Sequence, residues 1–287
     1  MKRRFFNLFI VVFCVVLCII FFGNRNSLNL VAFDTKALKD NYVHSDIYHD
    51  DLLKTLEYQD TGRRLYREWK WKSFNGNKYQ IKFYVLEKHL QNATRNRKNT
   101  SAGPECWREM YNYDKQFLRS MLDQYRNIIQ VNRLTKREAM EMVVSSTQHL
   151  AYTYVKPGYD ECKQARDVSV KICKTGGCCD GVTPWGVYSP VEYAAFGTGD
   201  CDTKSLFALT VLKELNMNFD VAMLTGMVDN DYHAILGVFS LNPTFRDVFV
   251  RDIRTGKKYF GWEMTSEGCY LGQKCFNHYS QWEIYKM

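Results

Sequence analysis

The chain has 287 residues, of which 46% are hydrophobic and 24% are charged. These fractions are typical of a folded globular protein, so they exclude a disordered chain, a coiled coil and a polytopic membrane protein. The aromatic content of 15% favours a fold that contains β-strands. The formal net charge of +8 could serve an acidic partner or an anionic surface, but we interpret it as a solvated basic exterior and expect no nucleic-acid partner.

The first 23 residues predict export from the cytoplasm. Three basic residues at positions 2–4 precede an apolar run over 5–23. A run of this length is close to the about 20 residues that a helix needs to cross a bilayer, and the positive charge before it keeps the N-terminus in the cytoplasm. We interpret residues 1–23 as an uncleaved signal anchor that holds the protein to the membrane, with a cleaved signal peptide as the alternative. The remainder is then expected to face the periplasm or the cell exterior, or to be secreted if cleavage occurs.

Export changes the interpretation of the cysteines, because exported compartments permit disulfides. Two of the ten cysteines lie in the apolar run, which leaves eight beyond it. Cys269 and Cys275 flank a short segment and predict a small-loop disulfide. Four further candidates for disulfides lie in an insert over residues 156–185, namely Cys162, Cys173, Cys178 and Cys179. Zinc is the alternative for these four, but adjacent cysteines do not match the usual paired spacing, so we expect neither a metal nor another cofactor.

The polar residues 24–60 predict a tether between the apolar run and the folded part of the chain. Alternating apolar residues on both sides of an Asn-Gly-Asn sequence at 75–77 then predict a β-hairpin within residues 61–112, because Asn-Gly is a strong turn signal. The polar residues 92–104 are interpreted as a loop that separates this hairpin from the helices predicted further along the chain.

Residues 113–287 are expected to form the main domain. Apolar spacing over 117–129 predicts one helix, a capping-box pattern at Thr135 and Glu138 opens a second, and a third is predicted over 201–215. Short strands are predicted over 219–224, 233–239, 248–253, 259–264 and 281–285. Helices followed by an antiparallel meander predict an α+β fold, with helices packed on an antiparallel β-sheet.

Cys201 is distinguished from the other cysteines by its place after a glycine turn and at the start of a predicted helix. Unpaired N–H groups and the helix dipole at such a position favour the nucleophilic thiolate, and the same N–H groups can hold an oxyanion. A thiolate nucleophile also needs a base and a third group that orients the base. His233 opens a predicted strand and Glu263 lies on the next strand but one, so the strands can bring both side chains over the helix terminus.

The sequence Gly-Asp-Cys-Asp-Thr-Lys-Ser at 199–205, followed by a helix, a strand and His-Ala at 233–234, resembles the transglutaminase-like superfamily of papain-type cysteine enzymes. Residues 144–152 are similar to the helix of that family with a Gln and a downstream Tyr, and 189–192 resemble its Pro-x-Glu approach to the catalytic loop. The resemblance spans residues 117–265, about half of the chain, and points to an exported bacterial-type member.

The resemblance implies a transglutaminase-like or papain-like fold with the nucleophile at a helix N-terminus. It assigns Cys201 as the nucleophile, His233 as general base and then acid, and Glu263 as the orienting carboxylate, with Gln148 as the candidate oxyanion donor.

One position departs from the family pattern, because the family usually has Asp where this chain has Glu263. The glutamate is one methylene longer, which changes the geometry of its hydrogen bond to the imidazole. Asp252 and Asp247, on the strand between His233 and Glu263, are therefore the alternative acids.

These observations predict an exported thiol-dependent enzyme, a cysteine peptidase or amidase, that attacks an amide of a peptide or protein substrate through a thioester acyl-enzyme. A protein-glutamine transglutaminase is one alternative, since transfer to an amine uses the same nucleophile, base and acid. A catalytically silent binding or scaffold protein with the same fold is the other. Hydrolysis is preferred, because water needs no second substrate pocket.

Overall fold

The computed structural model describes residues 62–158, 179–182, 184–228, 231–240, 242–276 and 279–287. The predicted anchor over 1–23, the tether over 24–60, and Cys162, Cys173 and Cys178 of the insert lie outside the described residues. Within the described part of the chain, no helix has the length and apolar character needed to span a membrane.

The predicted β-hairpin is present. Strands β1 (Arg64–Lys72) and β2 (Lys78–Leu86) pair antiparallel along their full length. The turn is closed by a hydrogen bond of 2.8 Å from the Ser73 N–H to the Asn77 carbonyl, and Gly76 has a φ of 89° that suits glycine. The alternating side chains therefore put one face of the hairpin into the core, as the sequence predicts.

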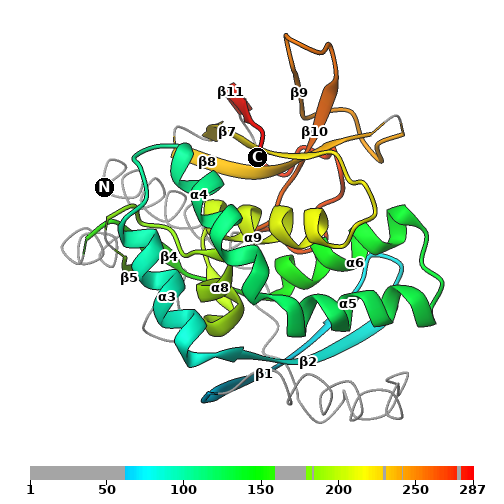
Figure 1. Ribbon diagram of the computed structural model, residues 1–287. Helices are drawn as coiled ribbons and strands as arrows, with labels where there is room; N and C mark the ends of the chain where they lie inside the picture. The colour runs from blue at the N-terminus through cyan, green and yellow to red at the C-terminus, as the bar shows by residue number, and fades with distance from the viewer. Residues whose placement is uncertain (1–61, 159–178, 183, 229–230, 241, 277–278) are drawn as a thin grey trace, which may run out of the picture. The chain divides into compact units, whose positions relative to one another are not determined.

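Helices make up the centre of the structure (Figure 1). Their bounds are α3 Glu87–Lys98, α4 Glu105–Asp114, the 3₁₀ turn η1 Lys115–Phe117, α5 Arg119–Val131, α6 Lys136–His149, α8 Pro190–Phe196 and α9 Cys201–Glu214. The capping box predicted for α6 is present, with Thr135 accepting from the Glu138 N–H and Glu138 accepting from the Thr135 N–H. Helix α9 lies between the main sheet and helices α6 and α8, so ten of its fourteen residues are buried.

The main sheet has five strands, all antiparallel, in the order β11-β7-β8-β10-β9. The strands are β7 Val221–Val228, β8 Asp231–Phe239, β9 Phe249–Arg251, β10 Lys258–Trp262 and β11 Tyr279–Tyr285. The α+β fold class is therefore confirmed, but the simple meander is wrong in detail. The chain leaves β8 for the outer strand β9 and returns along β10, so β8 and β10 become hydrogen-bonded neighbours.

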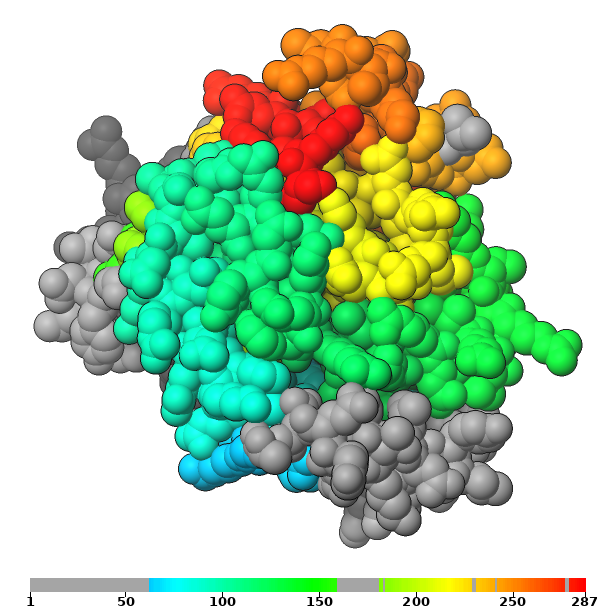
Figure 2. All heavy atoms as spheres, in the orientation of Figure 1, coloured from blue at the N-terminus to red at the C-terminus, as the bar shows by residue number. Residues whose placement is uncertain are grey.

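The last strand closes the other side of the sheet. Strand β11 pairs with β7 and lies beside α4 (Figure 2), where the Trp107 and Tyr285 rings are 5.6 Å apart. Two short parallel pairs complete the fold. They join β3 (Ala151–Tyr152) with β6 (Thr198–Gly199), and β4 (Tyr154–Lys156) with β5 (Cys179–Gly181).

The prediction of a loop over residues 92–104 is wrong for its first half, because α3 continues to Lys98. Two side chains four residues apart, Ala93 and Arg97, are the buried positions of this helix. Arg97 is buried because it pairs with Glu192 of α8, with 2.7 Å between Nε and Oε2. A helix whose buried face contains an arginine gives no apolar periodicity, so the sequence pattern does not reveal it.

The hairpin and the main domain share one core. Trp69 of β1 lies 5.0 Å from Phe83 of the hairpin and 5.6 Å from Phe207 of α9, measured between ring centroids. The predicted boundary between residues 112 and 113 falls inside α4. The hairpin region is therefore part of the same packed unit as the helices and the sheet.

Candidate active site

The turn before α9 is built to present Cys201 at the helix start. Gly197 is the C-cap that follows α8, and its φ of 69° is left-handed. The Gly197 N–H donates to the Tyr193 carbonyl. A Cβ at Gly199 would lie 2.5 Å from the Cγ2 atom of Thr203, so only glycine fits there. Cys201 is the first residue of α9, partly buried and not in a disulfide.

Two contacts to one residue fix the start of α9 against β8. The N–H of Ala234 interacts with the Cys201 sulfur, and the Ser205 hydroxyl donates to the Ala234 carbonyl at 3.2 Å. Because Ala234 directly follows His233, these contacts hold Cys201 beside His233. Cys201 and Ser205 are four residues apart and therefore share a face of the helix.

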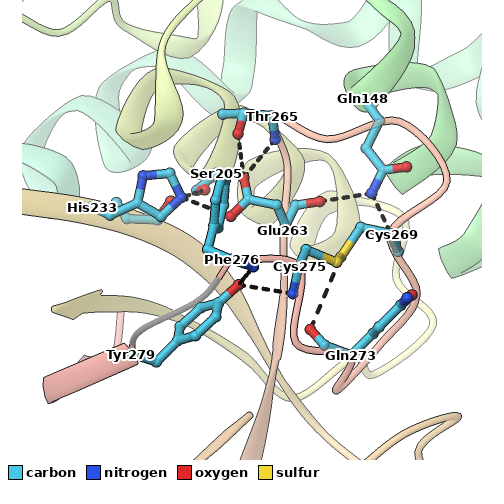
Figure 3. Close-up of polar contacts among 11 residues, drawn as sticks. Gln148, Ser205, His233, Glu263, Thr265, Cys269, Gln273, Cys275, Phe276 and Tyr279 are labelled. Atoms are coloured by element: carbon cyan, nitrogen blue, oxygen red, sulfur yellow. Dashed lines mark hydrogen bonds and ion pairs between the residues drawn. A yellow bond between two sulfur atoms is a disulfide. The ribbon is translucent and has the colours of Figure 1, made fainter. Parts of the chain in front are cut away.

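His233 and Glu263 are brought together as the sequence predicts. The His233 Nε2 atom lies 2.7 Å from Glu263 Oε2, and the Glu263 side chain is only 2% exposed (Figure 3). The other carboxylate oxygen, Oε1, accepts from the Thr265 N–H at 2.7 Å and from the Thr265 hydroxyl at 2.5 Å. With Nε2–H donating to the carboxylate, Nδ1 is the basic nitrogen of the ring.

The register of the sheet explains how the side chain of Glu263 reaches His233. The last pair between β10 and β8 is Trp262 with Leu236, so an unbroken register would place Thr265 opposite His233. Glu263 is two residues short of that position. Its extra methylene extends the carboxylate toward the imidazole, and Thr265 holds the carboxylate from the other side.

The alternative acids lie elsewhere. Asp252 is bound by its own turn, through the Arg254 N–H at 2.9 Å and the Thr255 hydroxyl at 2.6 Å, and by an ion pair with Lys286. Asp247 is exposed to solvent. Glu263 is the acid at His233 in the described part of the chain.

Gln148 is placed differently from the oxyanion role that the resemblance implies. Its Nε2 atom donates to the Glu263 carbonyl at 2.6 Å and to the Cys269 carbonyl at 3.0 Å, and its Oε1 atom accepts from the Gly268 N–H at 3.2 Å. Gln148 is 4% exposed, and both N–H donors of its amide are used by these bonds. The structure thus makes Gln148 a positioning residue for the segment that carries Glu263 (Figure 3).

The pKa of the Cys201 thiol is raised, whereas a position at a helix N-terminus is expected to lower it. Burial raises the pKa of the Cys201 thiol, and the carboxyl groups of Asp202 and Asp200 raise that pKa further. The Ala234 N–H acts in the opposite direction but is the smaller effect. These effects favour the protonated thiol of Cys201 over its thiolate.

Asp200 and Asp202 flank the nucleophile and interact with each other. Burial is the largest cause that raises the pKa of each carboxyl, and the two side chains are hydrogen-bonded. Two such carboxyls share a proton more readily than they hold two charges. The pair therefore adds less negative charge beside Cys201 than two ionised carboxylates would.

The predicted disulfide between Cys269 and Cys275 is present. It closes the loop that precedes Phe276, whose ring lies edge-on to the His233 ring with 5.3 Å between centroids. Cys179 begins β5, and nothing further about the four cysteines of the insert falls within the described residues. Within the described ranges, no group of His, Cys, Asp and Glu residues is arranged to bind a metal ion.

Several residues near the site are given no role by the sequence reasoning. Ser205 has a signal, since it stands one helical turn from Cys201, and so does Thr265, two residues from Glu263. Phe276 gives no such signal, because its place beside His233 depends on the disulfide loop. Tyr152 lies near Cys201, where burial raises the pKa of its hydroxyl and repulsion from the thiolate form of Cys201 adds to the effect.

Comparisons of the chain with models of known protein families and with curated proteins find no match. A functional assignment must therefore be argued from the geometry around Cys201, His233 and Glu263.

Proposed function

We propose that this protein is a cysteine hydrolase, a peptidase or amidase, that cleaves an amide bond through a thioester on Cys201. The observation that carries the proposal is the 2.7 Å hydrogen bond between His233 and the buried Glu263. It stands next to the helix terminus at which Ala234 holds Cys201. A nucleophile, a base and an orienting acid from three separate elements thus converge on one place.

In the proposed reaction, the Cys201 sulfur attacks the carbonyl carbon of the amide while Nδ1 of His233 takes the thiol proton. The imidazolium gives this proton to the departing amine, which leaves a thioester on Cys201. Water then attacks the thioester with His233 as the base, the C–S bond breaks, and the proton returns to the thiolate. Glu263 stabilises the imidazolium through its hydrogen bond to Nε2 in both steps.

Backbone N–H groups are the better candidates for stabilising the oxyanion, since the Gln148 amide is occupied. The first N–H groups of a helix have no acceptor within the helix, and the positive end of its dipole lies there. Cys201 is the first residue of α9, so its own N–H is favourably placed for an oxyanion formed on its sulfur.

The same features support membership of the transglutaminase-like superfamily. The nucleophile at a helix start, the histidine on an antiparallel strand and the acid after the neighbouring strand fit the resemblance in sequence. We further propose that residues 1–23 export the protein and anchor it to the membrane, with the enzyme facing the periplasm or the cell exterior.

A cleavage assay with the full chain tests the proposal. The protein is incubated with a mixed peptide library, and new peptide termini are identified by mass spectrometry. We expect cleavage by the wild type and by Cys106→Ala, a matched control that removes the buried free thiol of α4, and none by Cys201→Ala. Absence of cleavage by the wild type would contradict hydrolysis.

The same assay separates the acceptors. With a biotinylated primary amine present, conjugation to glutamine side chains that depends on Cys201 would replace hydrolysis by transamidation. If neither cleavage nor conjugation is observed, the result would favour a silent binding protein with this fold.

A further inference from the structure

Lys204 is a buried lysine three residues after the nucleophile. Its side chain belongs to the largest fully buried ones of the described structure, with 1% of the residue exposed. An ammonium group is strongly hydrated in water, so its burial is costly unless other groups replace the lost hydration. The groups that contact the ammonium therefore indicate how its burial is stabilised.

The ammonium connects two elements of the site. Lys204 Nζ donates to the Leu150 carbonyl at 2.6 Å, and Leu150 is the C-cap that directly follows α6. Carbonyls at a helix C-terminus lack partners within the helix and carry partial negative charge, which suits a cation. The same end of α6 contains Gln148, which holds the segment around Glu263. Lys204 of α9 thus holds the end of α6, and this end of α6 in turn holds the segment that contains Glu263.

Three carboxyl groups around Lys204 come from two segments, the one after β10 and the turn before α9. Burial is the largest influence and lowers the pKa of Lys204 to about 8, and the carboxyl groups of Glu263, Glu267 and Asp200 oppose this decrease. Of these, Glu267 also pairs with His149 at 3.1 Å. Glu263 is 2% exposed, so its carboxylate has little solvent of its own. Lys204 is therefore a buried cation, and of the carboxyl groups around it that of Glu263 has the largest influence on its pKa.

We propose that Lys204 is a positioning residue of the candidate active site: it joins the start of α9 to the end of α6 and compensates the buried charge of Glu263. This inference rests on the proposed role of Cys201 as the reactive thiol. Loss of the ammonium makes the surroundings of Cys201 more negative, which disfavours its thiolate. The loss also leaves the Leu150 carbonyl without its donor.

The test is the rate at which iodoacetamide alkylates Cys201 in the full chain, measured by peptide mass spectrometry. Lys204→Met removes the charge and the donor with little change in length, whereas Lys204→Arg keeps the charge. Lys213→Met is the matched control, because Lys213 lies at the other end of α9 and also donates to a backbone carbonyl, that of Met287. Cys106, 4% exposed, reports any general loosening of the fold by becoming labelled.

We expect Lys204→Met to slow alkylation of Cys201 at neutral pH by about tenfold, the effect of one pKa unit on the thiolate population. Lys213→Met should stay within about twofold of wild type, and Cys106 should stay unlabelled. A folded Lys204→Met protein that matches the wild-type rate within about twofold would overturn the proposal.

If Lys204→Met does not fold, the pH dependence of the arginine variant decides. Wild type loses the charge of Lys204 above its pKa of about 8, whereas arginine keeps its charge. The ratio of the Lys204→Arg rate to the wild-type rate should then rise several-fold from neutral to alkaline pH. A constant ratio would overturn the proposal.

Alkylation requires no substrate turnover, so its outcome is independent of the proposed reaction. A protein whose Cys201 responds to Lys204 in this way but cleaves no amide would contradict the hydrolase assignment and leave the positioning role intact.

Discussion

At the scale of single residues, the length of the Glu263 side chain determines how a carboxylate reaches His233. Strand β10 ends before the position opposite His233, and the carboxylate extends to Nε2 while Thr265 holds its other oxygen. Both oxygens of the carboxylate therefore have a partner, and the imidazole is held in one tautomer.

Substitution of Glu263 tests this orientation. Glu263→Gln keeps the length but presents a neutral amide, so we expect turnover to fall by about 10²-fold or more, since loss of the orienting carboxylate costs up to about 10⁴-fold in serine proteases. Glu263→Asp should retain partial activity, because the charge remains on a shorter arm. The measurement is the pH–rate profile of cleavage for the three proteins.

The exposed carboxylate of Asp247 supplies the control, with Asp247→Asn expected to match wild type. Unchanged turnover in Glu263→Gln together with a large loss in Asp247→Asn or Asp252→Asn would transfer the orienting role to the segment between β8 and β10. No loss in any of them would leave a Cys-His dyad.

The identities of the three central residues can be read from the sequence, because each is marked by a local signal. A glycine turn precedes Cys201, and His233 and Glu263 lie on or beside short strands rich in apolar residues. The role of Gln148 is not readable in this way, since its partners are backbone carbonyls that only the folded chain brings near. The pKa of Cys201 is also set by burial, which the sequence does not display.

At the scale of elements, contacts at the start of α8 hold the helix that leads into the turn before Cys201. Ser189 caps this helix and Glu192 closes the capping box. The Asp114 carboxylate of α4 accepts from the Val191 N–H at 2.9 Å, and Arg97 of α3 pairs with Glu192. Two buried acids therefore meet one buried arginine where α3, α4 and α8 come together.

This shortage of positive charge predicts a pH-dependent stability. Burial raises the pKa of Asp114 from 3.8 to about 7, so the folded protein binds this proton more tightly than the unfolded chain does. Stability is then highest below about pH 4 as far as this group is concerned, and is lost as the pH rises toward about 7. The free energy of unfolding at stake is on the order of 2–4 kcal/mol.

Asp114→Asn removes the titration and keeps an oxygen that can accept from Val191. We expect the variant to lose less stability than wild type between about pH 5 and about pH 8, measured by urea unfolding at both values. An exposed substitution, Asp247→Asn, should leave the pH dependence unchanged. Equal pH dependence in wild type and Asp114→Asn would contradict the account of these contacts.

The elements that the sequence predicts well are those that bury several large apolar residues at regular spacing. Helices α5, α6 and α9 also bury polar residues, but enough apolar ones remain to mark each helix, and the predicted bounds of these helices and of strands β7, β8 and β10 differ from the observed ones by a few residues. Helix α3 is missed, because its buried residues are only Ala93 and Arg97. The order of the strands is missed for another reason: pairing between distant strands leaves no local periodicity.

At the scale of the whole described structure, the strand order assembles the site. A simple meander would separate β8 from β10 by β9, whereas the observed order makes β8 and β10 neighbours. The end of β10 therefore delivers Glu263 to His233, and α9 packs on the same sheet. The hairpin β1–β2, which the sequence assigns to a separate region, completes the core beneath α6 and α9.

The most direct test of the central claim is the distribution of iodoacetamide among the thiols of the unreduced full chain. The structure predicts that Cys201 is labelled in preference to Cys106, and that the rate keeps rising into the alkaline range because burial raises the pKa of the Cys201 thiol. His233→Ala should slow this labelling at neutral pH by about tenfold or more, since the base that takes the thiol proton is lost. Preferential labelling of Cys106, or a Cys201 rate that His233→Ala leaves unchanged, would contradict the account.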